Sequence, residues 1–113
     1  MSTRSYIGKL NSDGSVTGVY CHHDGYPDGV GKTLQKHYSD VETVASLIQL
    51  GSLSSLGEDL DVTQAYHRDR GEDLDEPVVY PSVEAMVRNV PNDLGAEYAY
   101  VYDAVGGWQT FEF

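Results

Sequence analysis

Short β-compatible runs near one end of the chain, and alternating apolar and polar positions near the other, predict two β-hairpins. Residues 5–10 and 15–21 are short β-compatible runs, and residues 11–14 join them with the Asp-Gly signal of a hairpin turn. Residues 97–103 and 108–113 alternate clearly and are joined by residues 104–107. In the first of these, Tyr98, Tyr100 and Tyr102 share one face, with Ala99 and Val101 on the other. Both faces of residues 15–21 carry apolar atoms, which indicates a central or helix-covered strand pair.

Helical spacing of apolar residues appears between and after these runs. Residues 30–38 predict one helix, and a stripe over residues 41–48 predicts a second, with Gly51 as its stop. Ser39 is expected to cap the second helix, paired with Glu42 in a capping box. Ser82 is expected to cap a short helix that contains Val83, Met86 and Val87.

The remaining segments are less regular. Residues 52–60 predict an irregular segment and residues 62–67 a further strand, whereas residues 78–80, between two prolines, predict an edge piece. The order of strands, helices and strands predicts an α+β fold: an antiparallel sheet built from the N- and C-terminal hairpins, with two or three helices packed on one face. At 113 residues the chain is expected to form a single domain, 1–113.

Charge narrows the classes of partner. The chain has 18 acidic and 7 basic side chains, a net charge of −11. Nucleic acids and anionic membranes attract Lys and Arg, so neither is expected as a direct partner, whereas a basic protein surface is. One cysteine cannot form an internal disulfide, and no secretory signal or membrane-spanning run is visible, so a cytoplasmic location is expected.

Residues 58–76 concentrate this charge, with eight acids and two arginines. Such a run is commonly a solvated loop. In a functional interpretation, these carboxylates form a face that imitates the dense row of phosphate charges on DNA. Such a face could occupy the groove with which a basic protein binds DNA. A C-terminal hairpin beside this segment would make the negative face continuous. The candidate partner-binding residues are Asp59, Asp61, Asp69, Glu72, Asp73, Asp75 and Glu76.

The stretch from Tyr20 to Tyr38 carries the other candidate chemistry. Cys21, His22, His23 and Asp24 are residue types that bind zinc. Adjacent strand residues point to opposite faces, however, and no second Cys/His cluster supplies further ligands, so neither a metal nor a cofactor is expected. A Cys21–His thiolate pair is conceivable, but a lone cysteine at a strand end is commonly a small buried hydrophobe. We therefore assign no catalytic residue.

The motif Tyr20-Cys21-His22-His23-Asp24-Gly25-Tyr26-Pro27 resembles a family of small proteins from bacteriophages and other mobile elements. The N-terminal MSTRSYIG, the His37-Tyr38 pair, the segment YHRDRGED at residues 66–73 and the closing Tyr/Trp hairpin fit that family too. The resemblance covers nearly the whole chain. It implies a phage-type accessory protein and lends no catalytic assignment.

These observations predict a non-enzymatic, phage-type inhibitor of a bacterial nucleic-acid-targeting defence system in the host cytoplasm. By analogy of charge, size and origin, the specific expectation is an anti-CRISPR protein that mimics DNA and binds a basic DNA-binding subunit. The alternative is a small-ligand or metal-binding accessory protein, enzymatic or sequestering, that uses the turn between Cys21 and Tyr38.

Overall fold

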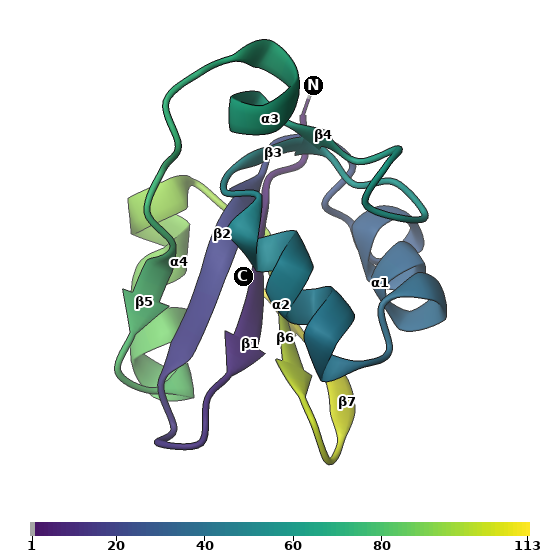
Figure 1. Cartoon of the computed structure of the whole chain (residues 1–113). Helices are drawn as coiled ribbons and strands as arrows, with labels where there is room; N and C mark the ends of the chain where they lie inside the picture. Colours follow the sequence, from purple (N-terminus) through teal and green to yellow (C-terminus); the bar gives the residue numbers. More distant parts are fainter. Residues whose placement is uncertain (1) are drawn as a thin grey trace.

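A computed structural model describes residues 2–113 and contains one mixed sheet flanked by helices (Figure 1). Within those residues the sheet has seven strands, in the order β4-β3-β2-β1-β6-β7, and β5 pairs with β2 beside β3. The strands are β1 (Ser5–Leu10), β2 (Val16–Cys21), β3 (Leu53–Ser55), β4 (Gln64–Ala65), β5 (Val78–Tyr80), β6 (Tyr98–Asp103) and β7 (Gly107–Glu112).

The α+β class and both terminal hairpins, β1–β2 and β6–β7, are confirmed. The sheet is mixed, however, and the expectation of a purely antiparallel sheet is wrong. β1 lies parallel to β6, and β2 lies parallel to β3. The two hairpins meet through their first strands, β1 and β6. Because these strands run parallel, the long chain between the hairpins must return to the end of the sheet at which β1 begins.

The helices are α1 (Lys32–His37), α2 (Val41–Gln49), α3 (Tyr66–Arg70) and α4 (Val83–Leu94), with a π-helical turn, η1 (Pro27–Gly31), leading into α1. Side chains of η1, α1 and α2 form one core with Ile7 and Val19, whereas α4 forms a second core with Tyr6 and Val16. Helices therefore cover both faces of the sheet, and the expectation of one covered face is wrong. The apolar atoms on both faces of β1 and β2 require this arrangement.

The predicted alternation of β6 is confirmed. Tyr98, Tyr100 and Tyr102 pack with the first core, and Ala99 and Val101 belong to the second. One strand thus carries large side chains toward α1 and α2, and small ones toward α4.

Two helix starts were predicted from capping residues, and one is correct. The Ser82 hydroxyl accepts a hydrogen bond from the Ala85 N–H at the start of α4. At α2, however, the N-cap is Asp40, whose carboxylate accepts from the N–H and hydroxyl of Thr43. Asp40 shares the capping preference of serine and sits one residue closer to the helix, so the assignment of Ser39 is wrong.

The middle of the chain differs most from the prediction. Residues 52–60 contain β3, and of the strand expected over residues 62–67 only Gln64–Ala65 forms, because α3 starts at Tyr66. α4 is longer than expected and includes Pro91 in its last turn. β5 is the expected edge piece, since β2 is its one partner within residues 2–113. No helix of these residues combines the length and apolar character that a membrane crossing needs.

Candidate functional site

The loop between β3 and β4 holds the first two candidate carboxylates. One Asp59 side-chain oxygen accepts hydrogen bonds from the backbone N–H groups of Asp61 and Val62, at 2.9 and 3.2 Å. Beneath it, the buried Thr63 hydroxyl donates to the Asp59 carbonyl, and the Tyr38 hydroxyl donates to the Gly57 carbonyl, each at 2.8 Å. Hydrogen bonds from buried side chains therefore fix the backbone of the loop, while the carboxylates of Asp59 and Asp61 stay exposed.

Residues 71–77, which we call the acidic strap, connect α3 to β5 and carry four more candidates. All seven strap residues are exposed. The Ser52 hydroxyl donates to Asp75 at 2.8 Å, and a ring nitrogen of His67 lies 2.7 Å from the Glu72 carbonyl oxygen. Side-chain contacts thus hold both ends of the strap against the fold, and its acids are Glu72, Asp73, Asp75 and Glu76.

Asp69 differs from the other candidates because it is neutralised locally. Its carboxylate pairs with the Arg68 guanidinium at 3.0 Å and accepts a hydrogen bond from the Ala65 N–H. These contacts, the bond from Arg68 first, lower the pKa of Asp69. Arg68 also donates to the Thr63 carbonyl oxygen. Asp69 is therefore a structural residue of α3 that has little free charge to offer a partner.

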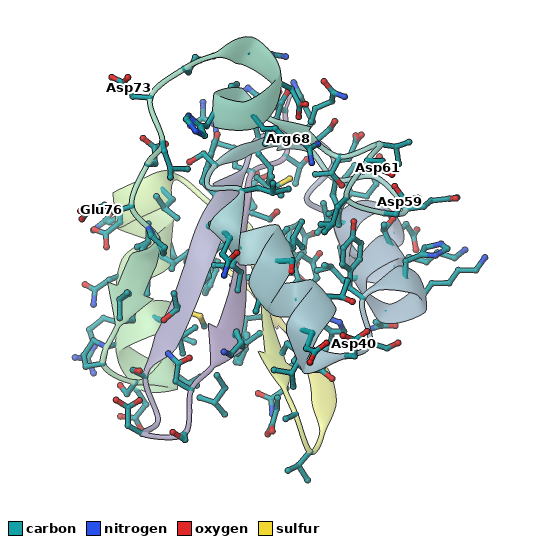
Figure 2. The ribbon with its side chains drawn as sticks, in the orientation of Figure 1. Asp40, Asp59, Asp61, Arg68, Asp73 and Glu76 are labelled. Carbon is teal, nitrogen blue, oxygen red and sulfur yellow. The ribbon has the colours of Figure 1, made fainter. Side chains whose placement is uncertain are left out.

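The carboxylates do not form one uninterrupted face. Figure 2 shows Asp73 and Glu76 along the strap on one side of α3, and Asp59 and Asp61 on the loop at the other side, with Arg68 between them. The β6–β7 hairpin lies at the opposite edge of the sheet from β4, so it does not continue the acidic segment as expected. Apart from Asp69, the candidate acids therefore form two groups, at the strap and at the loop.

An open hollow of about 660 Å³ lies under the acidic strap. It brings Tyr20, from the start of the Tyr20–Tyr38 stretch, together with strap acids that are far away in sequence. The Tyr20 hydroxyl lies 2.6 Å from a ring nitrogen of His22. The two stretches singled out in the sequence therefore meet here, and the hollow is lined by Tyr20, Ser52, Tyr66, Gly71, Glu72, Asp73 and Asp75.

The turn from His22 to Gly31 is built into the fold by backbone contacts. The N–H groups of His22 and His23 donate to β3, to the carbonyls of Leu53 and Ser54. Asp24 adopts a left-handed φ of 58°, and its carbonyl accepts from the Val30 N–H at 2.8 Å. These contacts explain the shape of the motif without any ligand.

Cys21 lacks the environment of a reactive thiol. It is fully buried, and this burial raises the pKa of the thiol to about 12. A nucleophilic or metal-binding cysteine needs its thiolate, which a lowered pKa favours. The geometry therefore supports the interpretation of Cys21 as a buried apolar residue.

The neighbouring histidines make local contacts. The rings of His22 and His23 meet edge to face with centroids 4.5 Å apart, and His23 lies 3.1 Å from the Ser2 hydroxyl. Partial desolvation lowers the pKa of His22, with His23 contributing next. Residues 2–113 contain no group of three or more His, Cys, Asp or Glu side chains arranged to hold a metal ion.

Sequence reasoning did not find the hollow, because the approach of Ser52 and Tyr66 to Tyr20 depends on the β2–β3 and β3–β4 pairings, which have no local signal. Comparison of the chain with family models, with curated proteins and with solved structures gives no match in any of the three. The function is therefore argued from charge and geometry.

Proposed function

We propose that the protein is a non-enzymatic inhibitor that binds a basic DNA-binding subunit of a bacterial defence complex. Its exposed carboxylates would occupy a Lys- and Arg-rich groove that otherwise binds DNA, as an anti-CRISPR protein of the DNA-mimic type would do. The observation that carries the proposal is uncompensated charge. The chain has a net charge of −11, and Arg68–Asp69 is the one ion pair in residues 2–113.

Restraint of the acidic groups supports this proposal. The Asp59 carboxylate is fixed by two backbone N–H groups, and Asp75 is fixed by Ser52. Charges that are already held in place lose less conformational entropy when a partner binds. Asp73 and Glu76 stay exposed on the same strap as Asp75 and are free to meet basic side chains.

The choice of a defence complex as the target rests on the resemblance of the Tyr20–Pro27 motif to small phage proteins. Long-range attraction between opposite charges speeds such encounters and weakens as salt is added. A DNA-mimic interface should therefore be strongly salt-dependent and should compete with DNA.

The first experiment captures a partner with the tagged protein from lysates of bacteria that carry defence complexes, at low and at high salt. We expect a DNA-binding subunit to be retained at low salt and released at high salt. The purified subunit is then tested for DNA binding with increasing amounts of the protein. A partner that is indifferent to salt, or that binds DNA equally well in the presence of the protein, would contradict the proposal.

A pair of charge-matched variants assigns the surface. Asp73→Asn with Glu76→Gln removes two charges from the strap, and Glu42→Gln with Glu84→Gln removes two exposed charges from α2 and α4. The strap variant should weaken inhibition several-fold more than the helix variant, with both folded. Equal effects would show that total charge acts without a defined surface.

The hollow favours a second candidate function, the binding of a small organic cation. Its strap carboxylates and the rings of Tyr20 and Tyr66 are groups that attract ammonium and guanidinium ions. Titration with spermidine, followed by nuclear magnetic resonance, should shift signals of Tyr20 and Tyr66 if this function holds. Shifts spread evenly over all acidic segments would indicate nonspecific attraction only.

A further inference from the structure

β7 leaves one edge of the sheet open, and its hydrogen bonds define which backbone groups are free. The Phe113 N–H donates to the Glu97 carbonyl oxygen at 3.0 Å, on the β6 side. Because antiparallel pairing alternates along a strand, the backbone groups of Trp108, Thr110 and Glu112 point away from β6. No strand of residues 2–113 lies on that outer side (Figure 1).

The open edge also lacks the features that usually prevent strand pairing. β7 is six residues long, pairs with β6 in regular register, and contains neither proline, lysine nor arginine. The opposite edge strand, β4, has two residues, an irregular register and α3 directly after it. Long and regular edges are templates for pairing with another strand, and Glu112 is the single charged residue of β7. β4 thus has several of the features that prevent strand pairing, whereas β7 has the length and regularity that pairing requires.

We propose that β7 pairs antiparallel with β7 of a second copy of this chain, centred on Thr110. In this register Thr110 lies opposite itself, and Trp108 lies opposite Glu112 of the second copy. All three outward-facing residues of each copy then form backbone hydrogen bonds, and the two sheets become one. The arrangement is a closed two-fold dimer, because the same edge is used by both copies.

The side chains favour this register over those centred on the other two outward-facing residues, Glu112 and Trp108. Pairing centred on Glu112 would place two carboxylates directly opposite each other, which is destabilising. Pairing centred on Trp108 would extend into the turn at residues 104–106 and leave Glu112 unpaired. Centring on Thr110 also places Phe113, which is 40% exposed, opposite Gly107 of the second copy, where an aromatic ring can cover the glycine.

The dependence on salt distinguishes this dimer from the proposed binding of a basic partner. Each copy has a net charge of −11, so added salt reduces the repulsion between copies and should strengthen the dimer. Binding to a basic partner should weaken under the same conditions. The dimer does not depend on the proposed inhibitory function, and either can fail without the other.

Sedimentation equilibrium over a range of protein and salt concentrations tests the association. Thr110→Lys places two lysines opposite each other and should convert the dimer to a monomer. Val105→Lys, at a turn residue that is 97% exposed, adds the same charge outside the pairing and should leave the dimer intact. A wild-type protein that stays monomeric at high concentration and high salt would overturn the proposal, as would a dimer that Thr110→Lys does not weaken.

Cysteine cross-linking tests the register. In a hydrogen-bonded antiparallel pair the opposed Cα atoms are about 5.5 Å apart, within reach of a disulfide. Thr110→Cys should therefore form a covalent dimer on oxidation, reversed by a reducing agent. In the same register position 109 lies opposite Phe111 of the second copy, so Gln109→Cys should cross-link much less. The wild-type protein, whose one cysteine, Cys21, is buried, is the control for background cross-linking. Equal cross-linking at positions 109 and 110 would overturn the register.

Discussion

The hydroxyl of Tyr100 donates a 2.6 Å hydrogen bond to the carbonyl oxygen of Gly25, in the interior of the protein. Tyr100 is 1% exposed and Gly25 is buried. The bond connects the C-terminal hairpin to the turn after β2, across 75 positions of sequence. The conformation of the Tyr20–Tyr38 stretch is therefore set partly by a residue of β6.

Removing this hydroxyl should destabilise the protein. Tyr100→Phe keeps the ring but leaves the buried Gly25 carbonyl without its partner, an effect of about 1–3 kcal/mol on the free energy of unfolding. Urea denaturation measures this change. Tyr26→Phe, at a ring that is 41% exposed, is the control and should change stability much less. Equal stability of the two variants would contradict the role assigned to the bond.

Gly29→Ala should disturb the turn directly. A Cβ at position 29 would collide with the backbone oxygen of Asp24, which is itself held by the Val30 N–H. Overpacking of this kind typically costs about 1–3 kcal/mol. Gly106→Ala is the matched control, because its Cβ would meet nothing closer than a side-chain oxygen of Asp103 at 3.8 Å. Thermal unfolding should show a lower midpoint for Gly29→Ala alone.

The N-cap of α2 predicts different effects for two adjacent residues. Asp40→Ala removes the acceptor for the Thr43 N–H, whereas Ser39→Ala removes a side chain for which no capping bond is found. Asp40→Ala should therefore lower the urea midpoint more than Ser39→Ala does. The Thr43 hydrogen bonds also lower the pKa of Asp40, so its stabilising effect should fade as pH falls through that lowered value. If Ser39→Ala were the more harmful change, the cap assignment would be wrong.

Cys21 should react only through unfolding. With a pKa of about 12 in the folded protein, almost no thiolate is present near neutral pH, and the side chain is fully buried. A chromogenic thiol reagent should label the native protein far more slowly than the urea-unfolded one. Fast labelling of the folded protein would reopen a chemical role for Cys21.

The same pKa makes stability depend on alkaline pH. An unfolded cysteine ionises near pH 8.5, well below the folded value of about 12. Stability should therefore be fully present below about pH 8.5 and decline as pH rises above it, because only the unfolded state releases the proton readily. Cys21→Ala should flatten this decline before the tyrosines begin to ionise near pH 10.

The fold was predictable where local pattern and tertiary contacts agree. The alternation of Tyr98 to Tyr102 located β6 and its faces, and the Asp-Gly pair at residues 13–14 located the first hairpin. The parallel β1–β6 contact has no local signal, because it joins strands separated by most of the chain. The apolar atoms on both faces of β2 indicated that both faces would be covered, but no local signal assigned α4 to the second face.

The candidate site was predictable in composition and not in arrangement. The charge run indicated which carboxylates would be exposed, and all seven candidates are exposed. Whether an acid is free or paired depends on its neighbours in space, and Asp69 is taken up by Arg68. The separation of the loop and strap acids by α3 depends on a helix where a strand had been predicted.

The parallel pairing of β1 with β6 has a consequence for how the protein is made. β1 leaves the ribosome well before β6 and carries the large apolar side chains Tyr6 and Ile7, which are fully buried in the finished sheet. Its neighbour on one side, β2, follows at once, but the other side stays vacant until β6 leaves the ribosome. Pairing over so long a separation is slow compared with hairpin closure. Between the synthesis of β1 and that of β6, the nascent chain therefore carries a half-finished sheet whose apolar side chains are open to chaperones.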